Sequence, residues 1–372
     1  MTLVSDWQFS ATQLHIDWAD GRKSTFSALW LRDHCQMPSS RDPVSGQRLI
    51  NITDIDPATH IINAQFIDDK FQLGFLPQAH ESIFAPQWLL DNTCFSNSDT
   101  NQRSSEKKIL WTKQNICNQF PTVNYELFCT STEKKKTALQ QVRDLGFVLI
   151  DSVPCKSGTV LDVIREFGFV RETNYGPLFE VRTEVDAINL AFTNLGLGCH
   201  LDNPYRDPVP GLQLLHCLSS STNGGESILQ DGFMAAQILF EENPEHFSIL
   251  NNQWIEYQFK NATTLLKARV PMIETNDLGQ VIKVRYNNRS IAPLRMPEAQ
   301  LSEFYPAYRQ FAEILERTEL QIQFKLSPGQ LILFDNTRIL HARTAYSGTG
   351  TRHLQGAYSD LDGLYSTLMR LE

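Results

Sequence analysis

The sequence lacks three features that would place it among secreted or membrane proteins. Its seven cysteines are an odd number, lie far apart and form no CxxC pair. No stretch approaches the ~18 apolar residues that a membrane span needs. The N-terminus lacks the basic start and the apolar segment of a signal peptide. Such cysteines are typical of reduced thiols, so we expect a soluble cytoplasmic protein without a disulfide framework.

Basic residues are also scarce. The formal net charge is −9, and the only basic run is the triplet at residues 134–136. A chain of this charge is not expected to bind nucleic acid. The length of 372 residues and a hydrophobic content of 41% are enough for a sizeable core, and they allow either two domains or one large domain with an appended module.

The first ninety residues show the patterns of short strands. Residues 13–18 and 24–30 are joined by the turn Ala-Asp-Gly-Arg at 19–22, which predicts a β-hairpin. A second pair, 64–67 and 70–75, is joined through two aspartates. The sequence therefore predicts a small β-rich unit at the N-terminus.

A polar stretch, poor in apolar residues, runs from residue 91 to residue 110 and has the composition of a linker. We therefore expect an N-terminal domain over residues 1–92, a linker over 93–110 and a larger domain over 111–372.

The larger domain combines a few helices with many short strands. Helices are expected from Ser131 to Gly146, over 160–167 and over 297–317. Strands are expected over 147–150, 212–218, 227–229, 254–259, 269–273, 281–286, 320–326, 331–334 and 354–358. This pattern predicts a mainly β fold with flanking helices, either a jelly roll or a barrel, and spacing alone does not separate it from another β-sandwich.

One short motif predicts a metal site. His200 and Asp202 are two residues apart, so in extended backbone both side chains leave the same face. With a distant second histidine, such a pair forms the facial triad of non-haem Fe(II) enzymes, and His341 is the candidate. Arg352 follows on a strand-like segment and could grip a carboxylate with two hydrogen bonds, as a 2-oxoglutarate oxygenase needs. The alternative is a hydrogen-bonded histidine near a turn and a surface arginine.

Five motifs together resemble the gamma-butyrobetaine dioxygenase family, in the same order over nearly the whole chain. They are HLDNPY at 200–205, GLQLLHC at 211–217, GGESILQDGF at 224–233, FDNTRILHAR at 334–343 and RHLQGAY at 352–358. The resemblance implies a double-stranded β-helix (jelly-roll) catalytic domain, Fe(II), 2-oxoglutarate and O2. It also implies ascorbate as a reductant in assays and a homodimer.

The resemblance assigns cosubstrate and substrate residues as well. Arg352, Leu215 and Ser227 would contact 2-oxoglutarate, although Ser227 could equally bond to a neighbouring strand. Aromatic rings would enclose a trimethylammonium group, which has no N–H to donate and is favoured by π faces. The matching residues are Tyr175, Phe179, Phe192, Tyr358 and Tyr205. Phe179 stands where some members have Trp and Phe192 where some have Tyr.

The opposite end of the substrate would be an anion. Asn189 and Asn287 match positions that contact a substrate carboxylate, and Arg289 and Arg206 lie close by in sequence. Either arginine could instead form a structural ion pair. If one of them points inward, the pocket would suit a more highly charged head such as a phosphonate.

The segment LWLRDHC at 29–35 resembles the start of the family's zinc site of three cysteines and one histidine. Cys35 and His80 match, but Met37 and Ser40 stand where two further thiolates are expected. A structural zinc normally has four protein ligands, so we expect no zinc here.

The resemblance thus predicts an Fe(II)/2-oxoglutarate dioxygenase that hydroxylates a small trimethylammonium zwitterion. Gamma-butyrobetaine, giving carnitine, is the leading expectation, and 2-trimethylaminoethylphosphonate is the main alternative. Trimethyllysine fits less well because nothing in the sequence is dedicated to its extra ammonium group. A catalytically inactive binding or sensor protein on the same fold is the alternative from another class.

Overall fold

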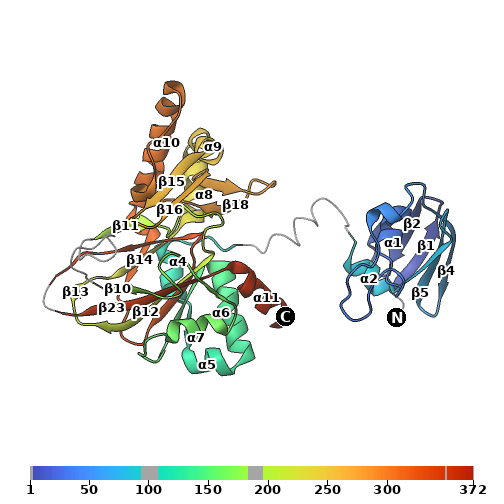
Figure 1. The fold of residues 1–372 in the computed structure, drawn as a ribbon, viewed down its shortest axis with the longest axis horizontal. Helices are drawn as coiled ribbons and strands as arrows, with labels where there is room; N and C mark the ends of the chain where they lie inside the picture. The colour runs from blue at the N-terminus through green and yellow to red at the C-terminus, as the bar shows by residue number, and fades with distance from the viewer. Residues whose placement is uncertain (1–2, 94–107, 183–195, 348–349, 372) are drawn as a thin grey trace. The chain divides into compact units, whose positions relative to one another are not determined.

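The computed structural model describes residues 3–93, 108–182, 196–347 and 350–371. The chain divides into two compact units, Met1–Ser105 and Glu106–Glu372 (Figure 1). Within the described ranges, no helix has both the length and the apolar character that crossing a bilayer requires.

The N-terminal unit contains two antiparallel sheets of three strands each. Their strands are β1 (Val4–Phe9), β2 (Gln13–Trp18), β3 (Lys23–Ser27), β4 (His60–Ile67), β5 (Lys70–Leu76) and β6 (His80–Phe84). Alternate residues of β2, Leu14, Ile16 and Trp18, are buried in the core of this unit, as the strand period requires.

Helix α1 (Ala28–Asp33) corrects one expectation for this unit. Residues 28–30 were expected to continue the hairpin, but the chain turns into a helix after Ser27. The Oγ of Ser27 accepts a hydrogen bond from the backbone N–H of Trp30 at 3.2 Å, which caps the helix. A serine in an alternating segment can continue a strand or cap a helix. At Ser27 the cap forms, so the strand ends and the helix begins. A second short helix, α2 (Pro86–Asp91), follows β6.

The larger unit is the expected double-stranded β-helix, built on two sheets. One has the order β10-β23-β12-β20-β8-β7, with β9 added on β23, and the other has the order β11-β21-β14-β19. The first sheet comprises β7 (Thr122–Asn124), β8 (Phe147–Asp151), β9 (Val170–Arg171), β10 (Phe179–Val181), β12 (Leu212–Ser220), β20 (Leu331–Asp335) and β23 (Arg352–Ser359). The second comprises β11 (Leu197–His200), β14 (Ser227–Asp231), β19 (Gln321–Phe324) and β21 (Ile339–Arg343).

Apolar residues from both sheets meet between them. Phe147 and Phe334 of the first sheet share one buried cluster with Leu229, Ile322 and Ile339 of the second. The two sheets therefore pack face to face, as in a sandwich. Every strand pair in them is antiparallel except β7 with β8.

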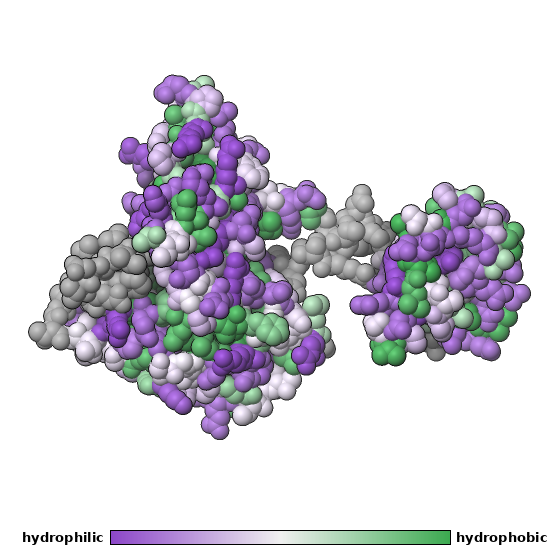
Figure 2. Space-filling view, in the orientation of Figure 1, coloured by the Kyte–Doolittle hydropathy of each residue, from purple (hydrophilic) through white to green (hydrophobic). Residues whose placement is uncertain are grey.

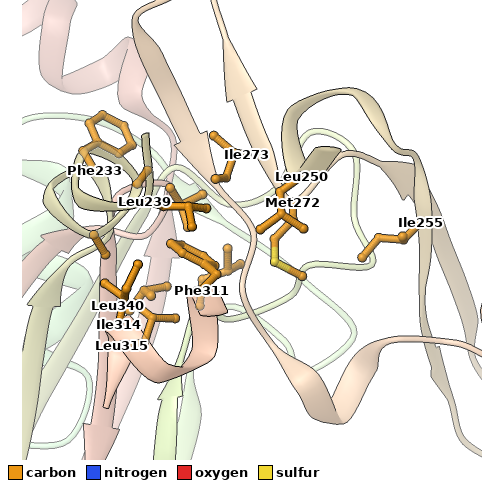
Figure 3. Packing of buried hydrophobic residues seen from close by; sticks show 14 of the residues in the cluster. Phe233, Leu239, Leu250, Ile255, Met272, Ile273, Phe311, Ile314, Leu315 and Leu340 are labelled. Atoms are coloured by element: carbon orange, nitrogen blue, oxygen red, sulfur yellow. The ribbon is translucent and has the colours of Figure 1, made fainter. Parts of the chain in front are cut away.

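Helices cover the sheets on both sides (Figure 1). One group packs on the first sheet and comprises α5 (Tyr125–Thr130), α6 (Thr132–Leu145), α7 (Thr159–Arg165) and α11 (Leu361–Leu371). The other comprises α8 (Gly232–Glu242), α9 (Pro244–Asn252) and α10 (Glu298–Leu315). Their apolar faces share a core with Met272 and Leu340 (Figure 3). Helix α10 shows mostly hydrophilic residues on the face seen in Figure 2.

Two short hairpins complete this side of the unit. They pair β15 (Ile255–Lys260) with β16 (Leu265–Val270) and β17 (Ile273–Thr275) with β18 (Val281–Val284). Elsewhere in the unit, two segments distant in sequence, β13 (Asn223–Gly224) and β22 (Tyr346–Ser347), form a small two-stranded sheet. The single strand expected over 269–273 is therefore wrong, because the chain leaves β16 before Pro271. Proline has no N–H to donate to a ladder, which explains the break.

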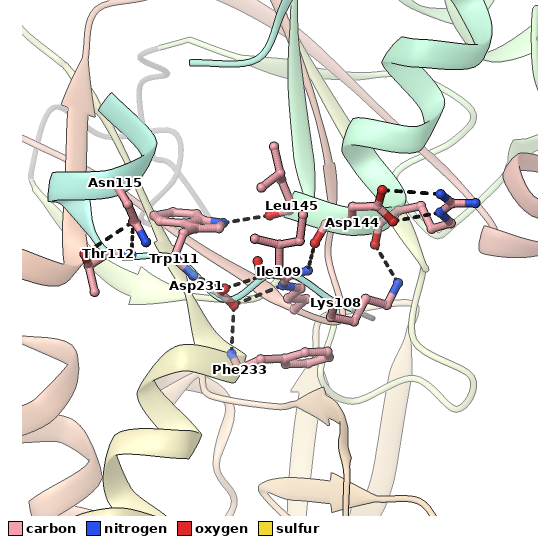
Figure 4. Close-up of polar contacts among 11 residues, drawn as sticks. Lys108, Ile109, Trp111, Thr112, Asn115, Asp144, Leu145, Asp231 and Phe233 are labelled. Carbon is pink, nitrogen blue, oxygen red and sulfur yellow. Dashed lines mark hydrogen bonds and ion pairs between the residues drawn. The ribbon is translucent and has the colours of Figure 1, made fainter. Parts of the chain in front are cut away.

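A buried ion pair joins the ends of two strands of the second sheet. Arg338, just before β21, donates to Asp231, at the end of β14, at 2.7 Å, and neither side chain is exposed. The guanidinium also donates to the carbonyls of Asp144 and Ile109. Asp231 accepts in addition from the N–H groups of Trp111 and Phe233 (Figure 4). This network fixes the start of the strand that carries His341.

Candidate active site

Two histidines and one carboxylate meet at the end of the second sheet. His200 and His341 are directly paired residues of β11 and β21. Oδ1 of Asp202 lies 3.4 Å from Nε2 of His200 and 3.9 Å from Nε2 of His341. One donor atom of each side chain lies within 4.8 Å of the other two. This is the only such group of three metal-binding side chains in the described part of the chain.

The backbone around His200 and Asp202 is not the continuous strand that the two-residue spacing predicted. His200 is the last residue of β11, and Asp202 lies beyond the strand rather than on it. Asn336 holds Asp202 in place, because its Oδ1 accepts from the Asp202 N–H and its Nδ2 donates to the Asp202 carbonyl, both at 3.0 Å. A bend, and not the strand period, therefore brings the two side chains together.

A hydrogen bond orients the imidazole of His200 to bind a cation through Nε2. Nδ1 of His200 donates to the carbonyl of Gly198 at 2.8 Å, which leaves the lone pair on Nε2. Burial lowers the pKa of His341 to about 3, and the nearby guanidinium of Arg289 acts in the same direction. Two imidazoles with one carboxylate are the donor set that suits Fe(II) with three positions left open.

Asp202 is held ionised, and its two oxygens face different groups. Burial by itself would raise its pKa, but the neighbouring imidazoles of His200 and His341 and the hydroxyl of Tyr358 hold this pKa well below its usual value. Oδ2 accepts from Nε2 of Gln213 and from the Tyr358 hydroxyl, each at 2.8 Å. Gln213 was not predicted as a site residue, although an amide inside the apolar run GLQLLHC was a usable signal.

A cavity of about 390 Å³ opens over these three side chains. Leu215, Ser227 and Arg352, the expected cosubstrate residues, all line it, as does Arg343. Burial lowers the pKa of Arg352, and its buried Nη1 has no hydrogen-bond partner in the described ranges. Its guanidinium lies 5.7 Å from the ring centre of Tyr346 and forms no ion pair with a described carboxylate. It is therefore available for an anion inside the cavity.

Aromatic rings form another wall of the cavity. Phe179 stacks on Tyr358 with ring centres 5.0 Å apart, and Tyr175 lies 6.5 Å from Phe179. Tyr205 stacks on Phe259 at 5.1 Å, and all five rings line the cavity. Phe259 was not expected at the site; it lies on β15, where the alternation with buried Tyr257 indicated only a core strand.

The expected anion-binding residues behave differently from one another. Asn287 lines the cavity; one hydrogen of its Nδ2 bonds to the carbonyl of Leu201 at 3.0 Å, and its Oδ1 has no partner among the described residues. Arg289 lines the cavity and has no ion pair or hydrogen bond to any described residue. Arg206 is not among the lining residues and donates to Asn174 instead. Asn189 and Phe192 lie outside the described residues.

Comparison with known proteins matches both units of the chain. Residues 112–358 match the family described as "Taurine catabolism dioxygenase TauD, TfdA family". Residues 6–90 match the family described as "Gamma-butyrobetaine hydroxylase-like, N-terminal".

Several relatives are similar over nearly their full length. The gamma-butyrobetaine dioxygenase of Pseudomonas sp. strain AK-1 is 31% identical and covers 97% of this chain and 94% of its own. The human gamma-butyrobetaine dioxygenase is 30% identical and covers 95% and 93%. The trimethyllysine dioxygenase of Meyerozyma guilliermondii is 27% identical and covers 97% and 94%.

Proposed function

The chain belongs to the TauD, TfdA family of dioxygenases, and on this premise we propose that it hydroxylates a small zwitterion carrying a trimethylammonium group, with gamma-butyrobetaine as the leading substrate. The expected dependence on Fe(II) and 2-oxoglutarate is confirmed by the family, and the grouped histidines and aspartate are consistent with it. Bound iron with 2-oxoglutarate and O2 supplies the oxidant for inserting oxygen into a C–H bond.

Different residues of this chain would bind the metal and the cosubstrate. His200, Asp202 and His341 would hold the metal, with His200 directed by the Gly198 carbonyl. Arg352 would bind the distal carboxylate of 2-oxoglutarate, because a buried guanidinium without an ion-pair partner has high affinity for an anion. Because Arg352 lines the same cavity as the metal-binding residues, a bound oxo acid would reach them.

The single observation that carries the substrate proposal is the aromatic wall beside these residues. The rings of Tyr175, Phe179 and Tyr358 line the same cavity as Asp202 and His341. A quaternary ammonium is attracted to the faces of such rings by ~0.5–2 kcal/mol per contact. The rings would hold the ammonium group, and polar residues of the cavity would hold the anionic end. A carbon between the two ends would then face the metal.

A substrate panel tests this proposal. We expect gamma-butyrobetaine to gain one oxygen in mass spectra while 2-oxoglutarate is converted to succinate. The matched control is 5,5-dimethylhexanoate, which has the same shape but a neutral tert-butyl group, and it should react far more slowly. Equal turnover of the neutral compound would contradict the role of the rings. No consumption of 2-oxoglutarate with any quaternary amine would favour the binding or sensor protein.

One observation favours 2-trimethylaminoethylphosphonate as a second candidate. One of the two Nδ2 hydrogens of Asn287 bonds to Leu201, whereas the guanidinium of Arg289 lines the cavity with no ion pair or hydrogen bond to any described residue. A phosphonate carries up to two negative charges and three acceptor oxygens, so it gains more from a guanidinium than a carboxylate does.

Variants of Arg289 separate the two candidates. If the phosphonate is the substrate, Arg289→Gln should lower kcat/KM for it by ~10-fold or more, as expected for loss of a hydrogen bond to a charged group. The same change should affect gamma-butyrobetaine less. Arg289→Lys keeps the charge without the paired donors and should be intermediate. A larger loss for gamma-butyrobetaine than for the phosphonate would reject the second candidate.

A further inference from the structure

The two oxygens of the Asp202 carboxylate are in different surroundings. Oδ1 faces Nε2 of both histidines. Oδ2 points away from that spot and accepts hydrogen bonds from the amide of Gln213 and the hydroxyl of Tyr358. A carboxylate oxygen has two lone pairs, so these two donors occupy the full acceptor capacity of Oδ2.

We propose that Gln213 and Tyr358 are positioning residues that make Asp202 bind iron through Oδ1 alone. A free carboxylate can bind a metal through both oxygens. With two imidazoles, such binding would take a fourth coordination position and leave only two open. The oxo acid of 2-oxoglutarate needs two positions and O2 needs a third, so single-oxygen binding keeps the position for O2.

The strand pairing explains why these donors can hold the carboxylate. Gln213 of β12 and Tyr358 of β23 are directly paired residues of neighbouring strands. Both are almost completely buried, with 1% and 3% of their surface exposed. Each side chain is therefore fixed by the sheet, and neither can follow the carboxylate if it rotates. The backbone of Asp202 is fixed independently by Asn336.

Tyr358 also connects the metal site to the aromatic wall. Its ring stacks on Phe179, while its hydroxyl bonds to Asp202. Tyr358→Phe removes only the hydroxyl and keeps the ring. Gln213→Leu removes the second donor at nearly constant volume. Tyr308→Phe is the matched control, because it also removes one partly buried tyrosine hydroxyl, and Tyr308 of α10 does not line the cavity.

The test measures metal and cosubstrate binding separately, without substrate. Calorimetry under anaerobic conditions would give the Fe(II) affinity of the apoprotein and the 2-oxoglutarate affinity of the iron-loaded protein. For the Tyr358→Phe/Gln213→Leu double variant, we expect Fe(II) affinity to be retained or increased, because a second oxygen can now bind. With iron and 2-oxoglutarate bound, the affinity for NO, a probe of the O2 position, should fall roughly 10-fold or more, whereas the affinity for 2-oxoglutarate should change much less. Tyr308→Phe should change none of these affinities.

The outcomes are distinct. Parallel loss of Fe(II) and 2-oxoglutarate affinity would mean that the two residues only support the local fold, and unchanged values would mean that they have no role; both overturn the proposal. A crystal structure of the iron-loaded double variant should show both oxygens of Asp202 on the metal. The inference depends on iron at this site and not on the choice of quaternary amine. Failure of the substrate proposal would appear in the wild-type substrate panel instead.

Discussion

The phenyl ring of Phe179 fills the space that a side chain at Gly356 would occupy. The two residues are paired across strands β10 and β23, and a Cβ on Gly356 would lie 2.2 Å from Cζ of the ring. A contact this short forces the ring to move. Because Phe179 stacks on Tyr358, we expect Gly356→Ala to disturb the aromatic wall of the cavity.

Gly356→Ala should therefore raise the KM for the quaternary amine and leave the 2-oxoglutarate requirement nearly unchanged. Steady-state kinetics with each substrate varied in turn would measure both effects. The control is a double-mutant cycle with Phe179→Ala, since the alanine at position 356 should cost little once the ring is absent. If the two effects simply add, the clash with Phe179 is not the cause.

Variants of Arg352 test its role in binding 2-oxoglutarate. Its guanidinium is buried at the cavity without an ion-pair partner among the described side chains. We expect Arg352→Ala to raise the KM for 2-oxoglutarate by 10-fold or more, about the loss of one charge-assisted hydrogen bond. The KM for the quaternary amine should change much less. Arg352→Lys should recover part of the loss because it keeps the charge, and a larger effect on the amine would contradict the assignment.

The sequence motif indicated the metal site, and the resemblance to the family assigned most of the other expected residues that line the cavity. The spacing of His200 and Asp202 pointed to a metal site, and the structure places both beside His341. The reason given was incomplete, because Asp202 lies after the strand and a bend held by Asn336 orients it. Hydrogen bonds between distant segments do not appear in the periodicity of either one.

The same limit explains the residues that were missed. Gln213 and Phe259 reach the cavity from strands that are 46 positions apart, so only the folded sheets bring them together. Asn287 lines the cavity as expected, but one of its two Nδ2 hydrogens bonds to the carbonyl of Leu201, a contact that depends on tertiary structure. The N-cap at Ser27 and the break at Pro271 were local signals that the alternation of apolar residues concealed.

The N-terminal unit provides a prediction about metal content. Nε2 of His80 lies 3.2 Å from Sγ of Cys35, close enough for a direct hydrogen bond. Arg32 donates to Ser40, which stands where a thiolate was expected. We expect less than one tightly bound zinc per chain by elemental analysis, and no loss of stability on treatment with a chelator. About one zinc per chain that resists dialysis would contradict this, and Cys35→Ser would then identify its ligand.

The buried pair of Arg338 and Asp231 leads to a prediction about stability. Arg338→Met removes the cation and leaves the Asp231 carboxylate in a site where neither side chain was exposed. Loss of one partner of such a pair costs roughly 3–5 kcal/mol of unfolding free energy. The two N–H donors that remain on Asp231, from Trp111 and Phe233, should keep the cost near the lower end.

The chain has two compact units, so the stability of the larger unit must be measured separately from that of the N-terminal unit. Hydrogen exchange of peptides from β14 and β21 in increasing urea would follow the strands that the pair joins. The control is Arg338→Met/Asp231→Asn, which removes both charges. Since no uncompensated charge remains, we expect the double variant to be less destabilised than the sum of the single variants. Strictly additive losses would mean that the two groups do not interact, and that the carbonyl bonds of Arg338 to Asp144 and Ile109 carry its whole contribution.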